Sequence, residues 1–232
     1  YDGNPLRNSD VTVSGDGFAS GEGADYAVAG SQTLVGKSAN SFTYSLKDGT
    51  NSDNYIINTY EGVLTVTGRD AGDKFKISLE ACSLTVTYDG SEQSTEGFVT
   101  NTFTISGNEY TVEGIAAGAS AVHAGSYDVQ ITGSPVVKDA SGNDVTEQFD
   151  IDVVPGKLVI NRRNVELVSG SDTREYDGSP LTDNVVLAEG DRFASGEGAA
   201  FTVTGIQTVP GSSANTFTYV LNEGTNADDY NI

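Results

Sequence analysis

Two stretches of the chain carry the glycine spacing of a phosphate-binding loop. They are GDGFASGEGA at residues 15–24 and GDRFASGEGA at residues 190–199. A phosphate site needs a strand, a glycine turn and a helix N-terminus with free N–H groups. Here the stretch leads into a strand pattern, lacks the lysine, and places Asp16 and Glu22 where they would repel an anion. We therefore expect these loops to be architectural.

One glycine differs between the two copies of this loop. Gly17 of the first copy is Arg192 in the second, so this position does not depend on the absence of a side chain. Phe18 and Phe193 follow it in the two copies. The pattern predicts a β-turn or compact loop whose phenylalanine packs into a core.

Three acidic loops offer the oxygen-rich side chains that calcium prefers. They are DGTNSDNY at residues 48–55, EGTNADDY at 223–230 and KDASGNDV at 138–145. The candidate ligands are Asp53, Asp228, Asp139, Ser141, Asn143 and Asp144. None of these loops has the EF-hand order of spaced ligands, glycine and closing glutamate. Asx turns and solvated carboxylates are the favoured interpretation, with calcium as the alternative.

Nucleophilic catalysis would need a nucleophile beside a base. The chain has one thiol, Cys82, which fits a small buried side chain in a strand. Its one histidine, His123, fits a solvated loop. An ester between a threonine and Gln32 or Gln207 is a formal alternative. No carboxylate pair stands out for hydrolysis, so we predict no catalytic, cofactor-binding or metal-binding residue and no enzyme.

The composition predicts an all-β protein around these residues. Threonine and valine suit half-buried strands, and glycine, asparagine and aspartate supply turns. No segment has a helical period beyond one turn in residues 143–149. The net charge of −21, from 33 acidic and 12 basic residues, argues against nucleic acid or an anionic membrane as partner. No membrane span or signal peptide is visible, and we expect the sequence to be an excerpt.

A repeated unit of roughly 90 residues organises the chain. The motif YDG occurs at Tyr1, Tyr88 and Tyr176. Residues 1–57 align with residues 176–232 without a gap, and 33 of the 57 positions are identical. The middle copy is more distant but keeps matching strand segments.

These copies divide the chain into three modules, called repeats 1, 2 and 3. Repeat 1 covers residues 1–68 and lacks the N-terminal strand, repeat 2 covers 69–161, and repeat 3 covers 162–232 and lacks the C-terminal strand. Neither boundary is a Gly/Ser or Pro linker, so one repeat should run almost straight into the next. The predicted fold is an all-β tandem array of small β-sandwich-like or twisted-sheet modules arranged end to end.

Alternation of period two predicts the strands within a repeat. From Phe75 to Ala81 the apolar residues of one face stand at odd-numbered positions. From Leu84 to Tyr88 they stand at even-numbered positions, and this change predicts a bulge near Cys82. Aromatic residues recur in register in all three repeats, which predicts core positions. These are Tyr26, Tyr110, Phe201, Phe42, Tyr127, Phe217, Tyr55, Phe149 and Tyr230.

The repeated motifs resemble a known family. YDGxxL, the run VSGDGFASGEGA, GTNxDxY and the closing GxLTV are similar to the YDG/MBG-type tandem repeats of Gram-positive bacterial cell-surface proteins. The resemblance covers the whole chain, strongly in repeats 1 and 3 and more loosely in repeat 2. It implies a secreted, adhesin-like protein of the cell surface or cell wall, with no enzymatic activity.

The expected function is a stiff, acidic stalk that holds a distal binding domain away from the cell wall. The alternative is direct adhesion to a host glycan or protein through repeat 2, where residues 132–149 predict a longer loop than in the other repeats. The expected partners are neighbouring repeats of the same chain and a host glycan or protein. We expect no nucleic acid, no membrane insertion, no cofactor, and a monomer.

Overall fold

The computed structural model describes residues 1–232, and it is built from 18 β-strands. The only helical segments are three 3-10 turns, η1 (Ser52–Asn54), η2 (Thr146–Gln148) and η3 (Ala227–Asp229). None of its helical segments has the length and hydropathy needed to span a membrane. The predicted all-β fold is therefore confirmed, and so is the single helical turn expected in residues 143–149.

The chain folds as two compact units. Unit 1 comprises Tyr1–Leu79, Thr100–Ile115 and Gly133–Asp152, and unit 2 comprises Glu80–Val99, Ala116–Thr132 and Val153–Ile232. Unit 1 holds repeat 1 with part of repeat 2, and unit 2 holds the rest of repeat 2 with repeat 3. Packing therefore crosses the boundaries of the sequence repeats.

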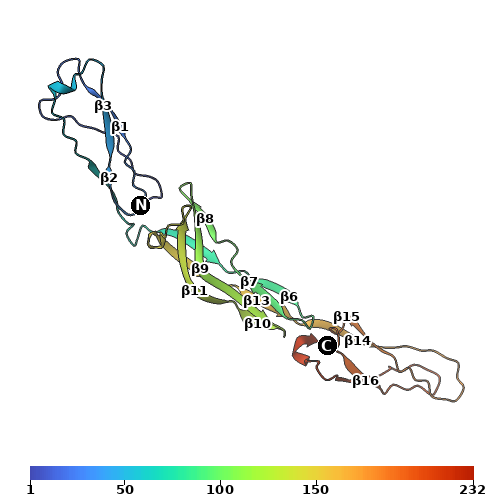
Figure 1. The fold of residues 1–232 in the computed structure, drawn as a ribbon. Helices are drawn as coiled ribbons and strands as arrows, with labels where there is room; N and C mark the ends of the chain where they lie inside the picture. The colour runs from blue at the N-terminus through green and yellow to red at the C-terminus, as the bar shows by residue number, and fades with distance from the viewer. The chain divides into compact units, whose positions relative to one another are not determined.

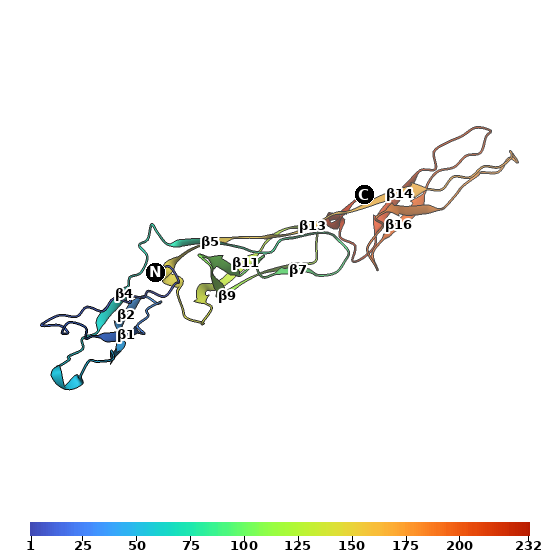
Figure 2. The ribbon, with the colours of Figure 1, turned by 90° about the horizontal axis from the view of Figure 1, so that it is seen from above.

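Repeat 1 consists of two antiparallel strand pairs within unit 1. The strand β1 (Ala24–Val28) pairs with β3 (Phe42–Leu46), and β2 (Gly36–Asn40) pairs with β4 (Gly62–Val66). Only Ser41 separates β2 from β3, so the chain passes from one pair to the other at that residue. Figure 1 shows β1 beside β3 in the blue part of the ribbon, with β2 farther along, and Figure 2 also labels β4.

Repeat 2 has the largest set of strands. They are β5 (Phe75–Glu80), β6 (Leu84–Thr87), β7 (Gln93–Glu96), β8 (Thr102–Ile105), β9 (Asn108–Ala121), β10 (Gly125–Asp128), β11 (Gln130–Asp139), β12 (Phe149–Val154) and β13 (Lys157–Asn161). The sheet orders are β11-β9-β7 with β8 on β9, β10-β13-β6, and β12-β5. The strand β9 contains residues 109–114, which align with β1, and β13 contains residues that align with β4. The segment 124–131, aligned with residues 39–46, is instead divided between β10 and the start of β11. Leu158 pairs with Tyr127, whereas Leu64, its aligned counterpart, pairs with Ser38, so the predicted match of Tyr127 with Phe42 was wrong.

Repeat 3 lies entirely in unit 2. Its strands are β14 (Arg163–Ser169), β15 (Val186–Gly190), β16 (Ala199–Val203), β17 (Phe217–Leu221) and β18 (Tyr230–Asn231). The antiparallel pair β16–β17 matches β1–β3 of repeat 1. The strand β14 pairs with β15 antiparallel and with β18 parallel, which places the C-terminus beside β14 (Figure 1).

The hydrophobic core of unit 2 is shared between repeats 2 and 3. Its buried members are Tyr88, Leu158 and Ile160 from repeat 2 and Val165, Ala194 and Tyr230 from repeat 3. Leu158 and Ile160 lie on β13, and Val165 follows on β14 after a short junction. Because burial of apolar surface is the main stabilising term in folding, this boundary is a packed core rather than a linker.

The change of strand parity near Cys82 is a break between two strands. The strand β5 ends at Glu80 and pairs with β12, whereas β6 begins at Leu84 and pairs with β13. The neighbouring chain breaks at the same level, where a Cβ on Gly156 would lie 2.8 Å from the Ala81 carbonyl oxygen. Three residues, 81–83, separate β5 from β6, and two residues, 155–156, separate β12 from β13. The predicted irregularity near Cys82 is thus a break in both segments, at which the pairing passes from β12 to β13.

The recurring aromatic residues differ in burial between repeats. Tyr110, Phe149 and Tyr230 are almost fully buried, which confirms them as core positions. Tyr26 of repeat 1 is 37% exposed and packs only its edge against Phe42, with 6.3 Å between ring centroids. The core prediction was wrong for Tyr26, because the sheet β1–β3 has only two strands and leaves more than a third of the residue's surface open to solvent.

Gly30 follows β1 where two backbone segments meet. A Cβ on Gly30 would lie 2.6 Å from Asn40 Cα, and a Cβ on its counterpart Gly205 would lie 2.5 Å from Asn215 Cα. The Gly30 N–H donates to the Ser41 carbonyl oxygen at 3.2 Å. Space therefore requires glycine at this position in both repeats.

Gly30→Ala is expected to destabilise unit 1 by about 1–3 kcal/mol, because the added methyl group must displace the Asn40 backbone. Gly23→Ala is the matched control, since a Cβ there meets only Lys47 Cδ at 3.7 Å, and we expect a change within about 1 kcal/mol. Urea unfolding followed by tyrosine fluorescence measures both. Equal unfolding midpoints for the two variants would contradict the close approach.

Candidate functional site at the repeat junctions

Left-handed residues form the turns of the glycine loops. Gly15, Gly17 and Gly21 have φ values of 80°, 70° and 87°. A Cβ added to any of them would meet no atom within 4 Å, so backbone conformation and not ligand approach favours glycine there. Arg192, the counterpart of Gly17, has φ 61° and adopts the same conformation. The element that follows the first loop is a strand, β1, and not a helix.

In repeat 1 the glycine loop is closed by Tyr55, which follows η1. The Tyr55 hydroxyl donates to the Glu22 carboxylate through Oε2 and accepts from the Ala19 N–H at 3.0 Å. The Phe18 ring packs against Tyr55 with 5.0 Å between centroids, although Phe18 is only half-buried. The hydrogen bond to Glu22 raises the pKa of Tyr55 above its ordinary value.

Repeat 3 builds the same closure with matching residues. The Tyr230 hydroxyl donates to Glu197 Oε2 at 2.7 Å and accepts from the Ala194 N–H at 2.9 Å. The Phe193 ring lies 5.1 Å from the Tyr230 ring. Here Ala194 and Tyr230 are 5% and 3% exposed, although the matching residues of repeat 1 are more open to solvent. A further segment therefore covers the loop in repeat 3.

That segment is the YDG motif of repeat 2. The Tyr88 hydroxyl donates to the second carboxylate oxygen of Glu197, Oε1. Its ring packs edge-on against Tyr230 with 5.6 Å between centroids. A Cβ on Gly90 would lie 3.4 Å from Ala194 Cβ. The YDG turn of one repeat is thus seated on the glycine loop of the next, and Tyr88 is only 3% exposed.

Burial and the shared carboxylate raise the pKa of both tyrosines in this joint. For Tyr88 burial is the largest cause, followed by its hydrogen bond and its charge interaction with Glu197. For Tyr230 burial is also the largest cause, and together with Glu197 it raises the pKa to about 12. The hydrogen bond from the Ala194 N–H acts in the opposite direction and lowers the pKa. Both hydroxyls therefore keep their protons at neutral pH and donate to Glu197.

Arg163 fixes the backbone of the seated YDG segment. Its Nη1 donates to the Tyr88 carbonyl oxygen at 3.0 Å. Its Nε and Nη2 donate to the Asp191 carbonyl oxygen at 3.0 and 2.7 Å, and Nε also donates to the Arg192 carbonyl oxygen at 2.7 Å. The planar guanidinium thus joins repeat 2 to the glycine loop of repeat 3.

Arg69 occupies the matching place at the junction of repeats 1 and 2, within unit 1. Its Nη1 donates to the Tyr1 carbonyl oxygen at 2.9 Å, and its Nε donates to the Asp73 carbonyl oxygen at 2.6 Å. Its guanidinium carbon lies 4.1 Å from the centroid of the Phe75 ring, a cation–π contact. The Tyr1 hydroxyl lies 3.4 Å from that of Tyr110. At both junctions an arginine that opens one repeat therefore binds the YDG tyrosine of the previous one.

The buried carboxylate of Asp229 completes the joint in unit 2, although no sequence motif marks this residue. Its side chain is fully buried, its Oδ1 accepts from the Ala124 N–H at 2.6 Å, and its Oδ2 lies 2.8 Å from His123 Nδ1. His123 is 62% exposed, as expected of a solvated loop residue, but one ring nitrogen contacts repeat 3. The only signal in the sequence is a difference between aligned positions. Repeat 3 has Asp229 where repeat 1 has the exposed Asn54.

The acidic loop of repeat 2 forms Asx turns. Asp139 Oδ1 accepts from the N–H groups of Ser141 and Asn143, each at 2.9 Å, and the Asn143 side chain also donates to it. Burial raises the pKa of Asp139, but these hydrogen bonds outweigh it and lower the pKa overall. Bonds from the Thr146 hydroxyl and N–H lower the pKa of Asp144. The carboxylates are thus occupied by local donors.

Asp53 and Asp228 lie in the 3-10 turns η1 and η3. Their N–H groups donate to the side-chain oxygens of Asn51 and Asn226 at 3.1 and 3.2 Å. Both carboxylates are exposed, and Asp228 Oδ1 lies 3.9 Å from Arg162 Nη2. No group of three or more histidine, cysteine, aspartate or glutamate side chains is placed to hold a metal ion.

Cys82 and the two glutamines are held by the fold. Cys82 is a half-buried free thiol at the break between β5 and β6. The side-chain nitrogens of Gln32 and Gln207 donate to the carbonyl oxygens of Leu34 and Val209, each at 2.6 Å. The two glutamines thus hold equivalent loops in repeats 1 and 3.

Residues 132–149, predicted to be a long loop, are mostly strand and tight turn. The strand β11 continues to Asp139, and β12 begins at Phe149. Val137 is fully buried, and its N–H donates to the Thr146 hydroxyl oxygen at 2.8 Å. The Val145 N–H donates back to the Val137 carbonyl oxygen at 2.9 Å. The loop prediction was therefore wrong.

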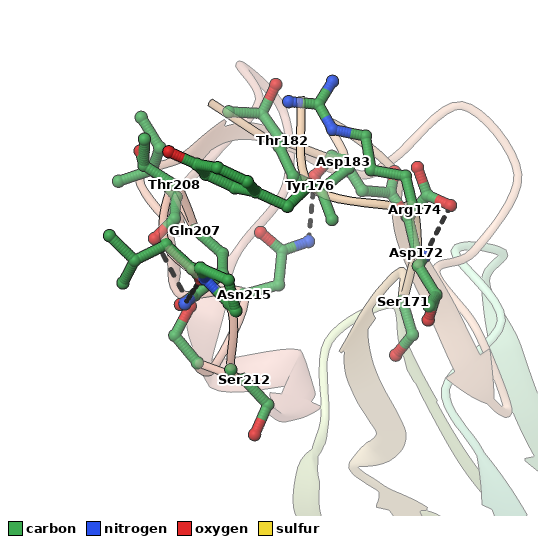
Figure 3. A pocket seen from close by; sticks show the side chains of 18 of the residues that line it. Ser171, Asp172, Arg174, Tyr176, Thr182, Asp183, Gln207, Thr208, Ser212 and Asn215 are labelled. Atoms are coloured by element: carbon green, nitrogen blue, oxygen red, sulfur yellow. Dashed lines mark hydrogen bonds between the residues drawn. The ribbon is translucent and has the colours of Figure 1, made fainter. Parts of the chain in front are cut away.

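Repeat 3 also contains a groove of about 490 Å³ between the segment with the third YDG motif and the loop before β17 (Figure 3). Asn215 joins its walls, because its side-chain nitrogen donates to the carbonyl oxygens of Gly170 and Asp183 at 3.0 and 2.8 Å. Figure 3 places Arg174 and Ser212 on opposite sides of Asn215. Polar side chains line the groove without a group that stands out as catalytic.

Polar side chains converge at the two joints, where Glu197 and Asp229 accept hydrogen bonds across one boundary and Arg69 donates across the other. They hold protein segments together by packing, charge-assisted hydrogen bonds and backbone contacts. No protein-family model, curated protein or solved structure matches the chain.

Asp229→Ala is expected to lower the free energy of unfolding of unit 2 by about 2 kcal/mol, because the buried Ala124 N–H loses its acceptor. Asp228→Ala removes the adjacent, exposed carboxylate and is expected to cost less than about 0.5 kcal/mol. Chemical denaturation of both variants measures the difference. A similar loss for the two would show that Asp229 does not hold the joint.

Alkaline pH is expected to weaken the joint between repeats 2 and 3. Because the folded state raises the pKa of Tyr230 from 10 to about 12, its contribution to stability is fully present below pH 10. It is lost as the pH rises through 12. The fall in melting temperature from pH 9.5 to pH 12 should be smaller in Glu197→Ala, where one cause of the raised pKa is missing. An equal fall in melting temperature in the wild type and in Glu197→Ala would contradict the role of Glu197 as the acceptor shared by the two tyrosines.

Proposed function

We propose that the chain is a set of non-catalytic structural repeats, which form a stalk or spacer in a secreted bacterial surface adhesin and project a distal binding domain. The observation that carries this proposal is the construction of the joints. At both boundaries an arginine at the start of one repeat binds the carbonyl of the YDG tyrosine of the previous repeat. Repeats that are fixed to one another hold a load at a set distance, whereas a flexible linker gives only an average reach.

The joint in unit 2 supports this role beyond the arginine contact. Tyr88, Glu197 and Tyr230 form one network, Asp229 binds the Ala124 N–H, and the core cluster draws from both repeats. Packed rings and buried hydrogen bonds resist bending more than a polar linker does. The net charge of −21 adds mutual repulsion between neighbouring molecules at a crowded surface.

The similarity of the motifs to YDG/MBG-type repeats supports an extracellular, cell-wall-associated location in a Gram-positive bacterium. The alternative, direct adhesion through repeat 2, depended on a long loop in residues 132–149. That segment consists of strand and hydrogen-bonded turns. No specific observation therefore favours direct adhesion through repeat 2.

Small-angle scattering of the full chain tests the spacer role. We expect a long, rod-like distance distribution that is the same with calcium and with EDTA. Tyr88→Ala and Arg163→Ala should broaden the distribution, because each loosens the joint, whereas Tyr60→Ala, which removes a ring that is 85% exposed, should not. Circular dichroism shows whether each variant stays folded.

A compact wild-type particle would overturn the spacer proposal. A distribution that Tyr88→Ala and Arg163→Ala leave unchanged would show that the joint does not set the spacing. A wild-type rod that loosens in EDTA would transfer the stiffening role to calcium.

A further inference from the structure

We propose that Asp229 and His123 determine which repeat can precede repeat 3. The buried carboxylate of Asp229 binds the end of repeat 2, which presents a ring donor. It disfavours the end of repeat 1, which presents Leu34 at the same place. The pair thereby keeps repeats 1 and 3, which are similar in sequence, from joining directly while the chain folds. The inference goes beyond the spacer role and holds whether or not the array is a spacer.

The loop that leads into β10 of repeat 2 corresponds to the loop that leads into β2 of repeat 1. Each loop lies between two positions whose strand partners correspond in the two repeats. These pairs are Ala121 with Gln93 and Gly125 with Ile160 in repeat 2, and Gln32 with Leu6 and Gly36 with Val66 in repeat 1. His123 therefore corresponds to Leu34, and Ala124 corresponds to Val35.

Both loops lie at the end of their repeat that meets the next one. Gly36 pairs with Val66, which stands just before Arg69 in unit 1. Gly125 pairs with Ile160, which stands just before Arg163 in unit 2. The residues at the tips of these loops are therefore placed to contact the repeat that follows.

Both oxygens of Asp229 are used by the loop of repeat 2. Oδ1 accepts from the Ala124 N–H at 2.6 Å, and Oδ2 lies 2.8 Å from His123 Nδ1. The Tyr127 hydroxyl donates to the His123 carbonyl oxygen at 2.9 Å and holds the loop in place. A carboxylate only accepts hydrogen bonds, so a loop with leucine at the histidine position leaves Oδ2 without a donor. A buried carboxylate oxygen without a donor is strongly destabilising.

Repeat 2 has a neutral side chain where repeat 3 has Asp229. Gln148 and Asp229 each stand directly before the closing aromatic residue, and they are 7% and 0% exposed. Gln148 Oε1 accepts from the Arg69 N–H at 2.9 Å, within its own repeat. Gln148 thus needs no donor from repeat 1, whose loop carries Leu34. Leucine precedes an amide at one boundary, and histidine precedes a carboxylate at the other.

The similarity of repeats 1 and 3 makes such a distinction useful. Of their 57 aligned positions 33 are identical, and misassembly between domains is a characteristic failure of repeat proteins. Tyr1 and Tyr88 both belong to YDG motifs, so the tyrosine contact with Glu197 does not distinguish repeat 1 from repeat 2. The loop residue does, because the wrong pairing leaves a buried charge unsatisfied.

A double-mutant cycle in the full chain tests the pair. His123→Leu gives repeat 2 the residue of repeat 1, and we expect it to raise the unfolding equilibrium constant of unit 2 about tenfold. Asp229→Asn added to His123→Leu should remove most of this loss, because the buried charge is gone. His123→Asn, which keeps a donor at the place of Nδ1, is the matched control and should stay within about threefold of the wild type.

Urea unfolding followed by tyrosine fluorescence measures the cycle, and hydrogen exchange of the Ala124 amide measures the joint locally. Exchange of this amide should be faster in His123→Leu than in His123→Asn. If His123→Leu does not fold, recovery of the fold by Asp229→Asn is the expected result, and no recovery counts against the proposal.

Transfer of the pair to the other boundary is the second test. Gln148→Asp shortens the side chain and draws its carboxylate back from the Arg69 N–H, so we expect unit 1 to be destabilised about tenfold. Adding Leu34→His should recover most of this loss and slow the exchange of the Val35 amide. Leu34→Phe adds a ring without a donor and should recover none of it.

Two results would overturn the proposal. One is a cycle in which the effects of His123→Leu and Asp229→Asn simply add. The other is a Gln148→Asp variant that Leu34→His helps no more than Leu34→Phe does. Both results are independent of the rod-like shape, which the scattering experiment tests separately.

Discussion

The carboxylate of Glu197, placed between two tyrosine hydroxyls, is the contact on which the joint of repeats 2 and 3 depends. Glu197 is half-buried, and a carboxylate that loses part of its hydration needs donors for its oxygens. Tyr230 supplies one from the same repeat, and Tyr88 supplies the other from the previous repeat. Closure of the glycine loop and attachment of the neighbouring repeat are therefore one network. Arg163 then holds the backbone of Tyr88 against the same loop.

The two repeats share a core because a single repeat can bury only a small apolar surface by itself. A paired set of strands needs a second layer over its apolar face, and only 37% of the residues are hydrophobic. The chain meets this need at the boundary, where Leu158 and Ile160 of β13 and Val165 of β14 join Tyr88 and Tyr230 in one cluster. Compact packing thus crosses the repeat boundary, and the short junction becomes part of a core.

Much of the fold could be predicted because strand alternation and turn residues are local signals. The exchange of Gly17 for Arg192 argued against a phosphate-binding loop and for a turn. The structure has a turn at both positions, and both residues adopt the left-handed conformation. Residues 132–149 misled the prediction because β11 contains Gly133, with φ 84°, and Pro135, which are residues typical of loops. Near Cys82 the alternation indicated the irregularity but not the change of partner from β12 to β13, because alternation reports the face of a strand and not its neighbour.

The joint could not be predicted because its contacts join residues that are far apart in the sequence. Tyr88 and Glu197 are separated by 109 positions, and His123 and Asp229 by 106, so no periodicity relates them. Repeats 1 and 3 keep the residues that close the loop but differ where the previous repeat is met, as Asn54 and Asp229 show.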